Sequence, residues 1–365
     1  MASVSSEVRY GFFLIPIAAI LLLVFTWDRS LAIPVLLVAA FVLVLTVFSA
    51  VHHAEVVALR VGEPFGSLIL AVAVTVIEVG MIVILMLDNP EKNLNLARDT
   101  VFSAVMITTN AIIGGSLLIK TLKKRVANFN PEGVVGALAT LAALSVLSMV
   151  LPTVTVSSPG PTFTSAQLWI AAITSFILYL TFVAMQTVRH RDYFLPPANS
   201  NSVPSIDTHV APPKNSIAIW SLAGLVVSLV GVVGLAKVSS PLIQGAVDGL
   251  GFPQMVVAVS IAMVVLLPES ISAFNAARFG RTQTSLNLGL GSALASIGLT
   301  IPVIAILSTS LGLSVNLGLG NTEIVFLFLT LIVTALTLIP GRATLLQGVV
   351  HLCIFASYIM VVFLP

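Results

Sequence analysis

Two glutamates, Glu78 and Glu269, are each the only acidic residue in a long apolar stretch of this chain. Glu78 lies in FGSLILAVAVTVIEVGMIVILML, residues 65–87, and Glu269 lies in PQMVVAVSIAMVVLLPESISAF, residues 253–274. Both stretches can cross a bilayer, because about 20 helical residues span its hydrocarbon. An ionisable group at that depth is costly and usually faces a bundle interior or an ion path. The pair therefore indicates a binding site for cations or protons.

Other oxygen atoms accompany the two glutamates. Thr75 lies one turn before Glu78 on the same helix face. Pro268 precedes Glu269, and a proline inside a helix frees the carbonyl four residues back, here that of Val264. Carboxylate, hydroxyl and carbonyl oxygens suit hard cations such as Ca²⁺ or Na⁺. Four polar residues on the spans that follow are lesser candidate ligands, with close helix packing as the alternative for any single hydroxyl: Thr109, Asn110, Ser292 and Ser296.

Two facing carboxylates carry two negative charges when the site is empty. One divalent cation or two protons would neutralise them, and two such close groups titrate as a pair. Cations and protons should therefore compete for one site. A protein that changes sides only when one or the other is bound is an exchanger.

The composition is that of an all-α polytopic membrane protein. Apolar residues make up 58% of the chain and charged residues 8%, against roughly 25% charged in a soluble protein. The small net charge of +2 gives no basis for nucleic-acid binding, and the single Cys353 excludes an intramolecular disulfide. We predict eleven spans, near residues 10–27, 31–51, 65–87, 100–120, 133–151, 166–188, 215–236, 253–275, 283–308, 322–339 and 344–363.

Lys and Arg divide unevenly between the two sides of the predicted membrane. Twelve lie in segments on the N-terminal side: Arg9, Arg60, Lys120, Lys123, Lys124, Arg125, Arg189, Arg191, Lys214, Arg278, Arg281 and Arg342. Four lie on the other side: Arg29, Lys92, Arg98 and Lys237. Because cytoplasmic loops are enriched in Lys and Arg, we expect a cytoplasmic N-terminus and a C-terminus on the outside.

The chain divides into an N-terminal helix (1–30), two five-helix repeats (31–188 and 216–365) and a cytoplasmic linker (189–215). The linker is polar and holds five prolines. Each repeat places an acid and a turn before its glutamate-bearing span: Glu55 and Gly62-Glu63-Pro64 in the first, Asp248 and Gly251-Phe252-Pro253 in the second. Since five is odd, the second repeat would be inverted, which places a shared site at the membrane midplane.

Other polar residues carry weaker signals. His52, His53 and Glu55 fit an interfacial cap, with cation access or pH sensing as the alternative. Glu323 would stabilise a helix N-terminus, and His351 is expected to be a hydrogen-bonded packing residue. An enzyme is not indicated, because the chain has neither an HExxH motif nor two aspartates within spans, and no GxxxxGK[ST] motif supports ATP-driven pumping. We expect no cofactor besides the transported ions.

Residues 54–86, AEVVALRVGEPFGSLILAVAVTVIEVGMIVILM, and the stretch 251–305 that begins GFPQMVVAVSIAMVVLLPES resemble the two alpha-repeats of the cation/calcium exchanger superfamily. They are most similar to bacterial Cha-type sodium/calcium–proton antiporters. The resemblance implies a bacterial inner-membrane antiporter that expels Ca²⁺, and also Na⁺ or K⁺, in exchange for protons. It places the family's repeat glutamates at Glu78 and Glu269, its Ser/Asn pair at Thr109 and Asn110, and its Gly-Ser pair at Gly291 and Ser292.

The chain departs from that family in two respects. Many members have Gly-Asn-x-x-Glu in both repeats, where this chain has VTVIE (74–78) and VLLPE (265–269). Without both asparagine oxygens, a monovalent-selective Na⁺ or K⁺/H⁺ antiporter is the main alternative, and a cation channel is another. The acidic helix that many relatives carry in the central loop is also absent.

The lipid bilayer and the transported ions are the expected partners of this protein. Assembly into a homo-oligomer is a further possibility that the sequence does not decide.

Overall fold

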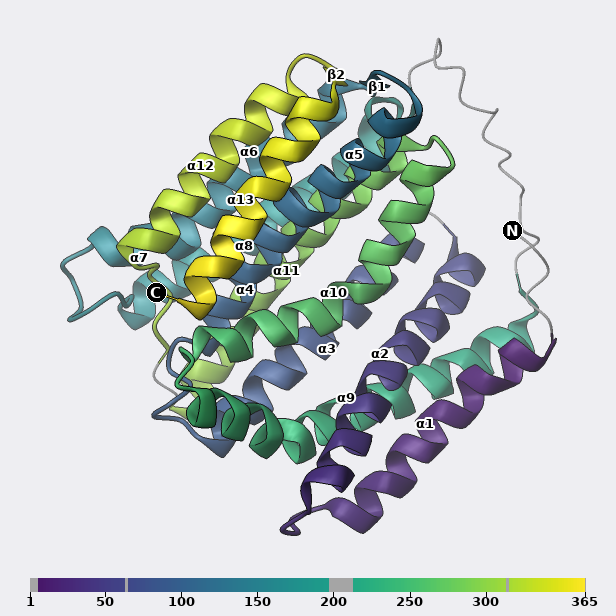
Figure 1. The fold of residues 1–365 in the computed structure, drawn as a ribbon, viewed down its shortest axis with the longest axis vertical. Coiled ribbons are helices and arrows are strands. Elements are labelled where there is room, and N and C mark those ends of the chain that lie inside the picture. The colour runs from purple at the N-terminus through teal and green to yellow at the C-terminus, as the bar shows by residue number, and fades with distance from the viewer. Residues whose placement is uncertain (1–5, 63–64, 197–212, 313–314, 365) are drawn as a thin grey trace. The chain divides into compact units, whose positions relative to one another are not determined.

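The computed structural model describes residues 6–62, 65–196, 213–312 and 315–364. Glu63 and Pro64 of the predicted first turn, and residues 197–212 of the predicted linker, lie outside the described residues. The chain is almost entirely helical, as predicted (Figure 1).

Each of the eleven predicted spans coincides with one helical run among the described residues. Six are single helices of the first and second halves: α1 (Ser6–Thr26), α2 (Ile33–Val61), α3 (Phe65–Asp88), α9 (Asn215–Leu250), α10 (Met255–Arg278) and α11 (Thr282–Leu311). Two more single helices end the chain, α12 (Asn321–Leu338) and α13 (Leu345–Phe363). Three runs contain a π-helical turn: α4 (Leu96–Met106) with η1 (Ile107–Ile112) and α5 (Ile113–Lys123); α6 (Pro131–Ser145) with η2 (Val146–Val150) and α7 (Leu151–Val154); and α8 (Ser165–Ala184) with η3 (Met185–Arg189).

Ten of these runs in the described part of the chain are long and apolar enough to cross a membrane. The remaining one, α1, has a shorter apolar part, Gly11–Thr26. The protein is therefore a multi-pass all-α membrane protein.

Helix α9 is longer than the sequence predicts. We expected the span to end near residue 236, but the helix continues through Pro241 to Leu250 and ends at Gly251, which has a left-handed φ of 68°. The charged residues that suggested a loop are paired instead. Lys237 donates to Asp28 at 2.8 Å and lies over the ring of Trp27, and Lys92 pairs with Asp248 at 2.9 Å.

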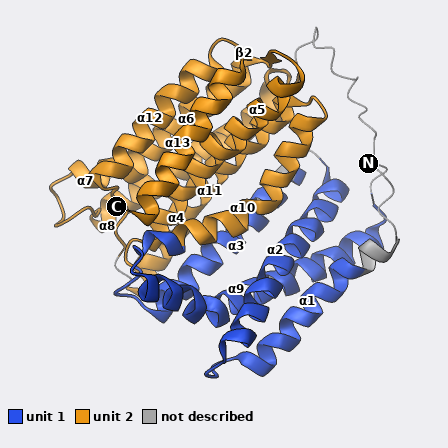
Figure 2. Ribbon diagram, viewed as in Figure 1, with its two compact units in different colours: residues 1–93, 209–257 blue, residues 94–208, 258–365 orange. Residues whose placement is uncertain are grey.

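The chain forms two compact units, 1–93 with 209–257 and 94–208 with 258–365 (Figure 2). Both units draw on both halves of the sequence. In unit 1, helix α9 packs against α1, α2 and α3. Its small residues allow the close approach: a Cβ on Gly224 would lie 2.6 Å from His53 Nε2, and one on Gly234 would lie 2.6 Å from Leu23 Cδ1.

In unit 2, the loops predicted on the N-terminal side gather at one end. Strand β1 (Ala127–Asn128) pairs antiparallel with β2 (Arg342–Ala343). The backbone N–H of Asn130 donates to the Gln283 side chain at 2.7 Å, and Asn287 donates to the Phe194 carbonyl at 2.8 Å. Phe194 ends η4 (Arg191–Phe194), so the first residues of the predicted linker are packed against this unit.

The loops predicted on the opposite side meet at the other end of unit 2. Arg98 bonds the Gly318 carbonyl at 2.8 Å and forms an ion pair with Asp99 at 2.7 Å. The backbone N–H of Leu319 donates to the Met149 carbonyl at 2.8 Å. Glu323 lies in the first turn of α12, where its carboxylate approaches the Gly320 N-cap, as expected for a stabilising acid at a helix N-terminus.

Candidate functional site

Glu78 is buried within α3 of unit 1. Its side chain is 3% exposed, and Thr75, one turn earlier on the same face, is 5% exposed. Helix α3 packs against α2 and α9, and a Cβ on Gly80 would lie 2.5 Å from Cγ2 of Val233 in α9. The sequence thus places one carboxylate and one hydroxyl at a buried position of a spanning helix that is held closely by its neighbour.

Glu269 is partly buried in α10 of unit 2, directly after the buried Pro268. The helix runs unbroken through this proline, so the Val264 carbonyl has no N–H donor at position 268. Helical spacing puts Glu269 on the same face as Leu266 and Ala273. Those two residues belong to a core cluster with Ile107 and Ile112 of η1 and Ala104 of α4. Glu269 therefore belongs to the face of α10 that packs towards the π-helical turn.

The π-helical turn η1 carries the polar residues predicted on the fourth span. Thr108, Thr109 and Asn110 have no exposed surface. The Thr108 hydroxyl donates to the Ala104 carbonyl at 2.7 Å, and that of Thr109 donates to the Val105 carbonyl at 2.5 Å. Such wide turns disturb the regular helical hydrogen bonds and occur often at functional sites. The 3.6-residue periodicity of the sequence does not reveal this turn. The consecutive Thr-Thr-Asn is a local signal for it, because such side chains bond nearby backbone groups and disturb a regular helix.

Asn110 is the centre of a buried hydrogen-bond network. Its Nδ2 donates to the Thr330 hydroxyl of α12 at 2.9 Å, and its Oδ1 lies 3.0 Å from His351 Nδ1 of α13. Since an amide oxygen only accepts, His351 carries its proton on Nδ1, and Nε2 then accepts from Thr337, 3.2 Å away. All four side chains are buried. In this arrangement the Asn110 amide joins η1 to α12 and α13, and His351 is the hydrogen-bonded packing residue that the sequence suggested.

Ser292 and Ser296 lie on the face of α11 that approaches η1. Helical spacing places both serines on the same face as Gly289. A Cβ on Gly289 would lie 3.2 Å from Ile113 Cγ1 and 3.4 Å from the Thr108 carbonyl oxygen. Ser296 is buried and Ser292 is half-buried. Unit 2 therefore brings together three of the predicted elements: Glu269 on α10, the η1 polar run and the two serines of α11.

The predicted partner carboxylate, Glu78, belongs to unit 1. Because Glu78 and Glu269 belong to different units, the approach of one carboxylate to the other stays a prediction. Across the described ranges, no three or more His, Cys, Asp or Glu side chains gather as a metal-binding cluster.

The two histidines of α2, for which the sequence suggested an interfacial cap, contact Phe12 of α1. Pro16 in α1 has no N–H to offer the carbonyl of Phe12. Ser49 donates to that carbonyl at 2.7 Å, and His53 Nε2 lies 3.1 Å from it. His53 is fully buried, whereas His52 stacks on the Phe12 ring at 4.0 Å. Ser49 and His53 together satisfy the carbonyl that Pro16 leaves free, and an unpaired carbonyl in a membrane-spanning helix is costly.

Comparison with known proteins agrees with this architecture. The family model described as sodium/calcium exchanger protein matches residues 31–188 and 220–364. The chain belongs to this sodium/calcium exchanger family. It is 43% identical over 338 residues to "Putative ionic transporter y4hA" of Sinorhizobium fredii, covering 93% of this chain and 90% of that protein. It is 31% identical over 352 residues to "Sodium-potassium/proton antiporter ChaA" of Escherichia coli, covering 95% and 94%.

Solved structures of the same fold include two with low sequence identity. The structure of native YfkE has a TM-score of 0.72 and 17% identity, covering 97% of this chain and all (100%) of that one. The H⁺/Ca²⁺ exchanger CAX has a TM-score of 0.67 and 14% identity, covering 97% of this chain and 89% of that one. These likenesses show that this chain has the exchanger fold. Its relatives are transporters, which supports a transport role.

Proposed function

We propose that this protein is a secondary active antiporter that moves cytoplasmic cations outward in exchange for protons. The observation that carries the proposal is the pair of carboxylates, one on each of two membrane-spanning helices, in a chain of the sodium/calcium exchanger family. Glu78 and Glu269 would bind a cation or protons in turn. Thr75, Thr109, Ser292 and Ser296 would add neutral oxygens, and Asn110 would act through its position in the buried network.

The mechanism follows from charge. With both carboxylates ionised, the site carries two negative charges in a low-dielectric region, which is unfavourable unless they are neutralised. One Ca²⁺, monovalent cations or two protons restore neutrality. Only a neutralised site would cross between the two access states, so inward movement of protons is coupled to outward movement of the cation. Alternating access of this kind occurs in transporters built from two inverted repeats around a midplane site.

The two-repeat organisation has support beyond the residue pattern. The family model matches two stretches, 31–188 and 220–364, which nearly coincide with the proposed repeats 31–188 and 216–365. Each repeat holds five helical runs in the described residues. Inversion of the second repeat follows from this odd number.

The ion carried is proposed as Ca²⁺, with Na⁺ and K⁺ as further substrates. The alternative is a monovalent-selective Na⁺ or K⁺/H⁺ antiporter. Two observations favour that alternative: neither glutamate has the asparagine three residues earlier that many relatives have, and the Escherichia coli relative is named a sodium-potassium/proton antiporter. The fewer neutral oxygens a site offers, the less it can replace the six to eight oxygens that Ca²⁺ prefers.

We further propose a bacterial inner-membrane location, with the N-terminus and the 189–215 segment in the cytoplasm. The support is the distribution of Lys and Arg, twelve against four. In unit 2 the loops that carry most of these cations lie at the same end.

The proposed exchange is tested in proteoliposomes loaded with a pH-sensitive dye. Ca²⁺, Na⁺ and K⁺ are added separately to one side, with the membrane potential clamped. An antiporter moves protons only when a transported cation is present, and the rank order of the three responses gives the substrate. A cation channel would instead pass the cation without obligatory proton movement, and that result would contradict the proposal.

A further inference from the structure

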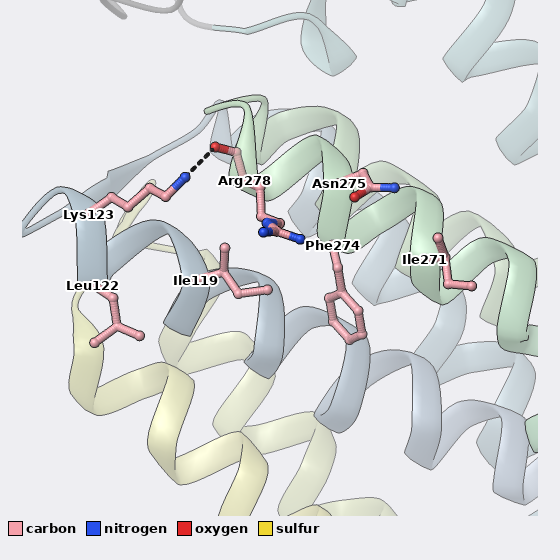
Figure 3. Close-up of a pocket in the computed structure, with 7 residues that line it drawn as sticks. All are labelled: Ile119, Leu122, Lys123, Ile271, Phe274, Asn275 and Arg278. Carbon is pink, nitrogen blue, oxygen red and sulfur yellow. Dashed lines mark hydrogen bonds between the residues drawn. The ribbon is translucent and has the colours of Figure 1, made fainter. Parts of the chain in front are cut away.

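A groove of about 540 Å³ lies between the C-terminal ends of α5 and α10 in unit 2 (Figure 3). Its lining combines apolar side chains, two cations and one amide: Ile119, Leu122, Lys123, Ile271, Phe274, Asn275 and Arg278. We propose that this groove binds an anionic phospholipid, with the headgroup phosphate on Lys123 and Arg278 and an acyl chain along the apolar wall. This site goes beyond the proposed transport of cations.

The order of the lining residues fits an amphiphile. Lys123 and Arg278 are the last residues of α5 and α10, so both charges lie where the two spans end. Ile119 and Phe274 lie one turn before them, towards the membrane interior. Two other wall residues are open to a lipid chain: Leu122 is 68% exposed and Ile271 is 47% exposed. Charges at the interface above an apolar wall match a phosphate above its acyl chain.

The two cations remain available to an anion. Lys123 Nζ donates to the Arg278 carbonyl at 3.1 Å, which uses one of its three donors and satisfies a carbonyl at the α10 C-terminus. In the part of the chain that the structure describes, neither Lys123 nor Arg278 forms an ion pair with a carboxylate. Figure 3 shows the Arg278 guanidinium directed between Ile119 and Phe274, into the groove.

The charged residues closest in sequence to the two lining cations are mostly positive. Lys120, Lys124, Arg125 and Arg281 lie close in sequence to the two lining cations, and Lys120 donates to the Gly280 carbonyl at 3.0 Å. Residues 113–131 and 270–281 contain no Asp or Glu. A path for the transported cation would be lined by acids rather than by these cations. The charge therefore selects an anion, and the apolar wall selects one with a hydrocarbon chain.

Occupancy would join two elements of the candidate site. Helix α5 continues directly from η1, and α10 carries Glu269. A phospholipid held by Lys123 and Arg278 would bridge the ends of these helices. Any effect of the bound lipid on transport rests on the proposed function. The test therefore measures lipid binding itself and does not depend on transport activity.

The test is native mass spectrometry of the purified full-length protein with dioleoyl phosphatidylglycerol or dioleoyl phosphatidylcholine. The groove variant is Lys123→Gln/Arg278→Gln. The matched control, Arg189→Gln/Arg342→Gln, also removes two exposed cations from the same end of unit 2 but from outside the groove. A third variant, Ile271→Asn, changes only the apolar wall. Glycerol 3-phosphate serves as a headgroup without chains, and size-exclusion profiles check that each variant is folded.

We expect wild type and the control pair to bind phosphatidylglycerol in preference to phosphatidylcholine. The groove pair should bind phosphatidylglycerol roughly thirty-fold more weakly, since each basic residue near an anionic headgroup contributes a factor of about five to six and the two factors multiply. Ile271→Asn should weaken binding several-fold, and glycerol 3-phosphate should not compete at equal concentration. Equal binding of the two lipids, equal loss in the control pair, or full competition by glycerol 3-phosphate would each overturn the proposal.

Discussion

At the residue scale, the buried polar side chains fall into two groups: those proposed to bind an ion and those whose hydrogen bonds join one helix to another. Glu78 and Glu269 were identifiable from sequence, because each is a lone acid in an apolar run. The role of Asn110 was not, because its partner His351 lies 241 residues away. The packing role of His53 was likewise hidden, since it depends on a carbonyl that Pro16 frees in another helix.

Thr330→Val should destabilise the protein, because it removes the hydroxyl that accepts from Asn110 Nδ2 while keeping the side-chain shape. A buried amide donor is then left without that partner, at a cost of about 1 kcal/mol. The check is the thermal unfolding midpoint in detergent. Thr140→Val is the matched control, since Thr140 is half-exposed and its hydroxyl bonds only its own helix at 2.9 Å. Equal midpoints for the two variants would argue against the network.

At the element scale, helix positions were predictable and helix irregularities were not. Long apolar runs located every span, since the bilayer demands about 20 residues of satisfied backbone. The wide turns in the fourth, fifth and sixth spans shift the helix by one residue, which average hydropathy does not register. The extra length of α9 was missed because Lys237 and Asp248 suggested a loop, whereas ion pairs with Asp28 and Lys92 accommodate both charges on the helix.

Close packing of α5 against α13 depends on two glycines. A Cβ on Gly114 would lie 2.6 Å from Cβ of His351 and 3.2 Å from the Gly348 carbonyl oxygen. Gly114→Ala should therefore destabilise the protein by about 1–3 kcal/mol through overpacking. Gly136→Ala is the control: nothing lies within 4 Å of its Cβ, and removing a glycine from helix α6 should stabilise by about 0.5–1 kcal/mol. Opposite shifts of the thermal midpoint are expected, and a neutral Gly114→Ala would contradict the packing.

At the scale of the whole molecule, the membrane class, the number of spans and the exchanger family could all be predicted from the sequence. What it could not supply is the grouping into units, because unit 1 joins residues 1–93 to 209–257 from the other half of the chain. That grouping follows from helix packing such as α9 against α1 to α3, which no local pattern encodes.

The proposed topology predicts which loops a membrane-impermeant thiol reagent can reach. In a Cys353→Ser background, Ser200→Cys should react in inside-out vesicles and stay unlabelled in intact spheroplasts. Ser157→Cys, in the loop between α7 and α8, should show the reverse pattern. The reason is that the side richer in Lys and Arg faces the cytoplasm. Reaction of both cysteines from the same side would contradict the topology.

The central claim is that Glu78 and Glu269 together form the exchange site. It is tested in inside-out vesicles that carry an imposed pH gradient, to which Ca²⁺, Na⁺ or K⁺ is added. Wild type and Glu132→Gln, which alters an exposed acid in the first turn of α6, should collapse the gradient. Glu78→Gln and Glu269→Gln should each abolish the response to every cation, because one remaining carboxylate cannot alternate between cation and protons as the pair does. Collapse of the gradient at the wild-type rate in either variant would contradict the account.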